Sequence, residues 1–135
     1  MESAQIHINY LAVLVVTIFA FVLGGLWYGP LFGKAWMQET GITEEVAKKS
    51  NMVKTFGLSI ILNIVIALNM SAFLGPKTDF QFGLFAGLAT GIGFVSASIG
   101  IMYLFSQKSL RLFLIDAGYQ TVIYAIMGAI LGAWK

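Results

Sequence analysis

Cysteine is absent from the sequence, and its absence excludes several classes of site. Disulfide frameworks, thiolate metal sites and cysteine nucleophiles all depend on this residue. The sequence also has a single histidine, so a cluster of several histidine ligands cannot form within one chain. We therefore expect no metal site and no bound cofactor.

Charge is scarce as well, and its scarcity identifies the environment of the chain. Only 10% of the 135 residues are charged and 59% are hydrophobic, whereas about a quarter of a soluble domain is charged. The net charge of +2 is too small to predict a nucleic-acid partner. The composition predicts a membrane protein, partnered by the lipid bilayer, with residues 1–135 forming one domain.

Four long apolar stretches account for most of the chain. They predict transmembrane spans at about residues 6–28, 53–74, 80–106 and 110–134. No Lys or Arg precedes Lys34, so the first span lacks the basic start of a secretory signal and is expected to remain as an anchor. The sequence predicts an all-α, multi-pass bundle of four transmembrane helices.

A short polar segment separates the first two spans and has the signals of a small helix. Thr43 is placed to cap it, Glu44 and Glu45 fall in its first turn, and Lys48 and Lys49 fall in its last turn. That order of charges opposes the helix dipole. We expect a short helix that lies on the membrane surface.

Basic residues are distributed unequally between the two sides of the predicted bundle. Two of them, Lys77 and Lys135, fall on one side, and the other six fall in or beside the loops between spans one and two and between spans three and four: Lys34, Lys48, Lys49, Lys54, Lys108 and Arg111. The positive-inside rule places these two loops, with the surface helix, in the cytoplasm. Both termini are then outside the inner (cell) membrane.

An aromatic corner follows the first span. Its members are Trp27, Tyr28, Gly29, Pro30, Phe32, Gly33, Lys34 and Trp36. Trp and Tyr favour the membrane–water interface, so one interpretation is an ordinary aromatic belt with a turn. Proline and glycine also allow a helix to break and fold back, so the alternative is a folded-in plug around which other helices pack.

Asp116 is the acidic residue inside a predicted span, and such a residue is a functional candidate by default. Tyr119 and Gln120 share its helix face. Arg111 is poorly phased for pairing, so we expect Lys34 to supply the counter-charge. A structural ion pair, a proton or cation relay, and a hydrated interfacial aspartate are the alternatives.

Further polar residues lie deeper in the spans. Asn63 is near the bilayer middle of span two, and Ser96 approaches from span three. Intramembrane amides commonly form hydrogen bonds between helices, which is the structural interpretation. The alternative is a polar cavity, open to the cytoplasm, in which Asn63 and Ser96 join Asp116 and Gln120.

A row of glycines runs along the third span. Gly83, Gly87 and Gly91 are spaced by four residues, as in a glycine zipper. Small residues at this spacing let helices approach closely, either inside one bundle or between subunits of a homo-oligomer. The row is compatible with both, and we expect self-association.

Signatures of catalysis are missing. The sequence has no paired acidic residues in a span, no phosphate-binding glycine loop and no recognisable nucleophile motif. We do not expect an enzyme.

The motifs now placed resemble those of the bacterial membrane-protein family known as domain of unknown function 1761. The resemblance rests on the corner motif at residues 27–34 with Trp36, on Gly41-Ile42-Thr43 and on residues 114–119, Leu-Ile-Asp-Ala-Gly-Tyr. It covers essentially the whole chain. It implies a four-helix, multi-pass membrane protein with no established activity, and it provides no catalytic residues.

Three functions are compatible with these observations. The first is a structural or accessory component that acts by packing and association. The second is a small transporter or channel in which the polar residues around Asp116 handle a cation, a proton or a small solute. The third is lipid-headgroup binding, which would require Lys34, Lys108 and Arg111 to form one basic pocket.

The predicted orientation can be tested with introduced cysteines, because the chain has none of its own. Lys48→Cys and Lys77→Cys should react with a membrane-impermeant thiol reagent from opposite faces of sealed vesicles. Labelling of both positions from the same face would contradict the four-span topology.

Overall fold

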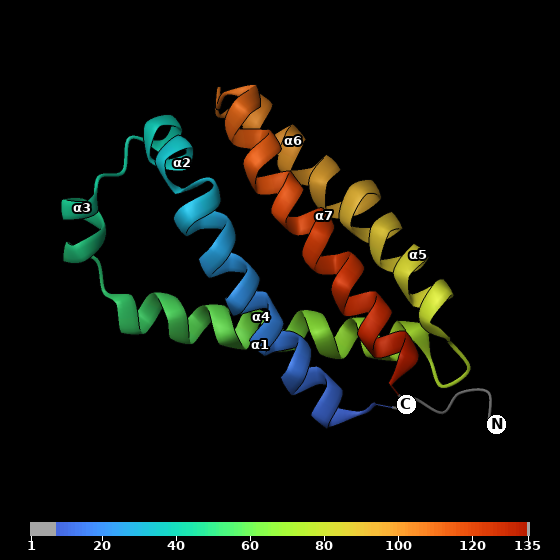
Figure 1. Cartoon of the computed structure of the whole chain (residues 1–135). Coiled ribbons are helices and arrows are strands. Elements are labelled where there is room, and N and C mark those ends of the chain that lie inside the picture. Colours follow the sequence, from blue (N-terminus) through green and yellow to red (C-terminus); the bar gives the residue numbers. More distant parts are fainter. Residues whose placement is uncertain (1–7, 135) are drawn as a thin grey trace.

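The computed structural model describes residues 8–134, and within this range the chain is helical with short connections and no strand (Figure 1). Ile6, His7 and Lys135 lie outside the described residues. Four helical stretches are long and apolar enough to cross a membrane: Tyr10–Leu31, Met52–Leu74, Phe80–Phe105 and Leu110–Ala133. The all-α class with four candidate membrane-spanning helices is therefore confirmed.

The chain forms seven α-helices and two π-helical segments in the described part. In order these are α1 (Tyr10–Leu26), η2 (Trp27–Leu31), α2 (Gly33–Thr40), α3 (Glu44–Lys49), α4 (Met52–Leu74), α5 (Phe80–Thr90), η3 (Gly91–Ser96), α6 (Ala97–Phe105) and α7 (Leu110–Ala133).

Side-chain caps start several of these helices. The Thr43 hydroxyl accepts the N–H of Val46 at 3.2 Å, so the predicted cap of the short helix α3 is confirmed. Asp79 caps α5 by accepting the N–H of Phe82 at 2.9 Å. Such caps satisfy N–H groups that the first turn of a helix leaves without a partner.

The predicted fold-back at the aromatic corner is wrong. Pro30 has no N–H to donate, but the helix widens into η2 instead of breaking, and the N–H of Phe32 reaches the carbonyl of Trp27 five residues back at 2.8 Å. A π turn accommodates the missing donor without ending the helix. In Figure 1, α2 continues onward from α1 in nearly the same direction.

Helix α7 is the helix around which the others pack. In the most apolar stretch of 18 residues of α7, 50% of the residues are buried, whereas the buried share of the corresponding stretch is 28% in the first span and 17% in α4. Its Met127 is almost completely enclosed, as is Val16 of α1. The core therefore lies along α7.

The contact between α5 and α7 brings two backbones together. A Cβ atom on Gly83 would overlap the carbonyl oxygen of Gly128, and one on Gly87 would overlap that of Tyr124. Across the same contact, a Cβ on Gly132 would overlap the carbonyl oxygen of Asp79. In this structure the glycine row of the third span therefore packs inside the chain.

Helix α4 has a different orientation from the other long helices. It crosses α1, α5 and α7 obliquely and does not align with them (Figure 1). Its side chains are mostly exposed, and the buried residues that it contributes, Ala67, Met70 and Ser71, all lie near its C-terminal end. The N-terminal half of α4 is thus loosely packed against the remaining helices.

The glycine contact gives a stability prediction. Gly87→Ala should lower the free energy of unfolding by about 1–3 kcal/mol, because the added methyl group forces the two backbones apart. Gly57→Ala in α4 is the matched control, since a Cβ there meets nothing within 4 Å, and alanine suits a helix better than glycine. Denaturant titration of each purified variant in mixed micelles measures its free energy of unfolding. Equal stability of the two would contradict the close contact.

Candidate functional site

The carboxylate of Asp116 is the meeting point of three segments. Asp116 lies in the second turn of α7, and its Oδ1 accepts the hydroxyl of Tyr28 from η2 at 2.6 Å. Its Oδ2 accepts the hydroxyl of Tyr103 from α6. Both carboxylate oxygens therefore have a phenolic donor, and the start of α7 is connected to the ends of the first and third spans.

The expected contact between Lys34 and Asp116 is wrong. Lys34 is exposed on α2, and Asp116 has no ion-pair partner in the described part of the chain. Because η2 carries the helix onward, Lys34 lies beyond the level at which Tyr28 reaches α7. Two O–H donors stabilise the carboxylate in place of a cation.

Trp27 anchors the aromatic corner on α7. Its indole Nε1–H donates to the carbonyl of Ile115 at 2.9 Å. The ring lies against Gly118, where a Cβ would be 3.0 Å from it. A larger residue at Gly118 would therefore displace the indole. The corner packs inward against α7 here, without the break in the helix on which the plug interpretation rested.

Tyr119 extends the aromatic cluster toward α1. Its ring centroid is 5.5 Å from that of Tyr28 and 6.4 Å from that of Trp27. Its hydroxyl donates to the carbonyl of Ala20 at 2.8 Å. Trp36 packs edge-on against Tyr28, with the centroids 6.1 Å apart. Aromatic pairs at such distances add to the stability of the contact.

The remaining corner residues have less direct roles. Phe32 contacts the ring of Trp27, with 4.9 Å between centroids. Gly33 is buried, and a Cβ there would lie only 2.6 Å from the carbonyl oxygen of Tyr28. Gly29 and Pro30 are exposed. The corner motif thus combines two residues that reach α7 with others that shape the π turn.

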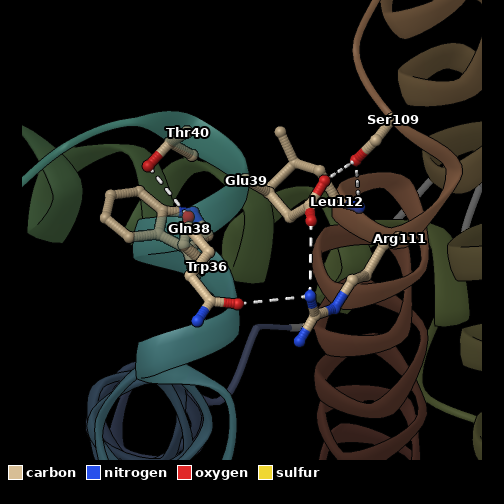
Figure 2. A network of polar contacts seen from close by, with 7 residues as sticks. All are labelled: Trp36, Gln38, Glu39, Thr40, Ser109, Arg111 and Leu112. Atoms are coloured by element: carbon tan, nitrogen blue, oxygen red, sulfur yellow. Dashed lines mark hydrogen bonds and ion pairs between the residues drawn. The ribbon is translucent and has the colours of Figure 1, made fainter.

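A group of polar side chains, which we call the clasp, joins α2 to the start of α7 (Figure 2). Arg111 Nη1 lies 3.4 Å from Oε2 of Glu39 and 3.3 Å from Oε1 of Gln38. The hydroxyl of Ser109, which also caps α7 by accepting the N–H of Leu112, donates to Oε1 of Glu39. Because the ion pair is partly exposed, its effect is orientation more than stability.

A cavity of about 610 Å³ lies between α1 with η2, α4 and α7. Its polar lining comes from all three: Tyr28, Ser59, Asn63, Tyr119, Gln120 and Tyr124. No Lys, Arg, Asp or Glu is among its lining residues. The oblique course of α4 leaves this space beside the core.

The predicted polar residues are only partly gathered there. Asn63 and Gln120 line the cavity, whereas Asp116 does not and is connected to it through Tyr28. Ser96 lies elsewhere, where its hydroxyl donates to the carbonyl of Ala117 at 3.3 Å. The alternative in which Ser96 and Asp116 also line the cavity is therefore not what the structure shows.

Asn63 and Gln120 differ in how their amide groups are used. The amide of Asn63 donates to the carbonyl of Ser59 in its own helix at 3.0 Å, so the expected hydrogen bond to another helix is not formed. Gln120 makes no side-chain hydrogen bond to any described residue. Its amide is thus available to a bound molecule.

Sequence reasoning missed Tyr103. A tyrosine near the end of a span is typical of an interfacial belt, so its type and position carry no signal of a bond to Asp116. Only the pairing of α6 with α7 across the short turn at residues 106–109 brings the two together.

Comparisons with known proteins identify the family. Residues 11–132 match the family described as protein of unknown function (DUF1761), and the chain belongs to it. The predicted resemblance is confirmed. Searches of curated proteins and of solved structures find no match to the chain.

The Trp27 anchor leads to a second stability prediction. Trp27→Phe should lower the free energy of unfolding by about 0.5–1.5 kcal/mol, because it removes the indole donor to Ile115 and keeps an aromatic ring. Trp36→Phe is the control, since the Trp36 indole makes no hydrogen bond within residues 8–134. Denaturant titration compares them, and an equal loss in both would show that the hydrogen bond contributes nothing.

Proposed function

We propose that this member of the DUF1761 family binds a small uncharged molecule in the cavity between α1, α4 and α7 and transports it. One observation carries the proposal. Hydrogen-bonding side chains from three separate helices, among them Tyr28, Asn63 and Gln120, converge on one space that no charged residue lines.

The chemistry of the lining supports an uncharged ligand. Binding sites for small molecules combine apolar walls with a few placed polar groups. Here Phe21 and Phe56 contribute apolar wall, and Gln120 offers an amide that is otherwise unused. A charged ligand would lack a counter-charge among the lining residues, and an unpaired charge away from water is costly. A neutral molecule with hydrogen-bonding groups fits the site best.

The looseness of α4 supports movement of the ligand. The buried residues of α4 all lie near its C-terminal end and its N-terminal half is mostly exposed, and few buried contacts imply a low free-energy cost of local rearrangement. On the other side of the cavity, α1 and α7 are joined by the aromatic cluster and the bond from Tyr119 to Ala20. A shift of α4 against this rigid wall would open or close the cavity.

The two other candidate functions explain less of the geometry. Lipid-headgroup binding needs Arg111 in a free basic pocket, but Glu39 and Gln38 engage its guanidinium group. A purely structural or accessory role agrees with the close contact between α5 and α7. It leaves the convergence of polar groups in the cavity unexplained.

Single cysteines test whether the cavity admits polar molecules. Asn63→Cys and Gln120→Cys should react with a charged, water-soluble thiol reagent in reconstituted vesicles. Ile92→Cys is the control at an exposed apolar position (56% exposed) in the middle of the third span. We expect reaction at the cavity positions to be at least about tenfold faster, because the reactive thiolate is disfavoured in hydrocarbon. Reaction as slow as at Ile92→Cys would overturn the proposed function.

A further inference from the structure

The Asp116 carboxylate lies between the cavity and one end of the bundle. Tyr28 lines the cavity and donates its hydroxyl to Oδ1 of Asp116 at 2.6 Å. On the opposite oxygen, Tyr103 donates its hydroxyl to Oδ2. These three side chains form an unbroken line of hydrogen bonds that begins at the cavity wall.

The far end of this line lies close to the turn at residues 106–109. Tyr103 is in the last turn of α6, and its carbonyl accepts the N–H of Lys108 at 2.9 Å. The side chain of Tyr103 is only partly buried, and most residues around the turn are exposed. The backbone of Tyr103 is therefore next to the turn, and its partly exposed side chain reaches from there to Asp116 in the second turn of α7.

No positive charge neutralises Asp116 within residues 8–134. The ionisable groups that face it are Tyr28 from η2, Tyr103 from α6 and Tyr119 from its own helix, and the Tyr119 hydroxyl donates to Ala20. Arg111 is paired with Glu39 in the clasp. A carboxylate at membrane depth without a cation is costly, so the two phenolic hydroxyls are the groups that stabilise it.

We propose that Tyr28, Asp116 and Tyr103 form a proton path between the cavity and the turn at residues 106–109. This inference rests on the proposed function, because the cavity supplies the water that delivers or receives the proton. It adds proton movement to the binding of an uncharged molecule.

Each proton transfer along the path conserves protons. A hydronium ion in the cavity gives a proton to the Tyr28 oxygen as Tyr28 passes its own hydroxyl proton to Oδ1, which leaves water in the cavity and makes Asp116 a neutral carboxylic acid. Rotation of the carboxyl group about the Cβ–Cγ bond turns this O–H toward Tyr103, and the Tyr103 hydroxyl turns its own proton away from Asp116 toward water. The acid then gives its proton to the Tyr103 oxygen as Tyr103 releases its own to that water, which becomes hydronium. Both phenols end with one proton, and the carboxylate is restored.

Proton flux into vesicles tests the path. The purified protein is reconstituted into vesicles that contain a pH-sensitive dye, and a potassium diffusion potential drives protons inward. Wild-type protein should carry protons faster than protein-free vesicles. Tyr103→Phe keeps the ring and removes only the hydroxyl, and it should lower the flux by about 100-fold, the scale of losing one positioned proton-transfer group.

Companion variants separate proton transfer from structural support. Asp116→Asn should lose the flux as Tyr103→Phe does, and Asp116→Glu should recover part of it. Tyr10→Phe is the control, because Tyr10 is exposed at the start of α1 and contacts no part of the path. It should conduct like the wild type. If Asp116 served only folding, its substitutions would lower the stability of the protein. The proton flux per folded molecule would then be the same in Asp116→Asn and Asp116→Glu, and that result would overturn the proton path.

The outcomes distinguish this inference from the proposed function. Wild-type flux equal to that of empty vesicles, or unchanged flux in Tyr103→Phe, overturns the proton path. If thiols at Asn63 and Gln120 still react in that case, the cavity stands and the path alone fails. If the thiols at these two positions do not react, the proposed function fails, regardless of the proton flux that the vesicles show.

Discussion

Close contact between the backbones of α5 and α7 is the constraint on which the other packing depends. In a membrane, helices gain little from burying apolar surface, because lipid is as apolar as their side chains. Glycines remove the side chains that would hold the backbones apart, as at Gly83 and Gly128. Close van der Waals contact then becomes the attraction. It fixes α7 beside the third span and leaves its other faces to α1 and α4.

With α7 held in this way, its second turn becomes the junction of the molecule. Trp27 and Tyr28 reach it from the first span and Tyr103 from the third. The junction combines hydroxyl and indole donors with one carboxylate, that of Asp116, and no Lys or Arg takes part in it within the described residues. Arg111, five residues before Asp116 on the same helix, pairs with Glu39 in the clasp and not with Asp116.

The cavity follows from the part of the bundle that this junction does not hold. Helix α4 makes its buried contacts near its C-terminal end, so the space beside Tyr119 and Gln120 is not filled by its side chains. A rigid wall on α7 and a loosely held wall on α4 are what a binding site with a moving element requires. Because α4 does not cover this part of α7, the amide of Gln120 remains available for a bound molecule.

The four spans and the cap at Thr43 could be predicted from the sequence, because length, hydropathy and capping are local properties. Asp116 was recognised as exceptional for the same reason, since a carboxylate in an apolar run is conspicuous. Its partners were not predictable. Whether Lys34 or Tyr28 reaches Asp116 depends on the π turn at Pro30, which alters the direction of every side chain after it. The sequence by itself determined which segments are helical and which residues are costly to bury. Only the tertiary structure decided which of them meet, because small changes in helix winding and crossing redirect side chains from segments far apart in the chain.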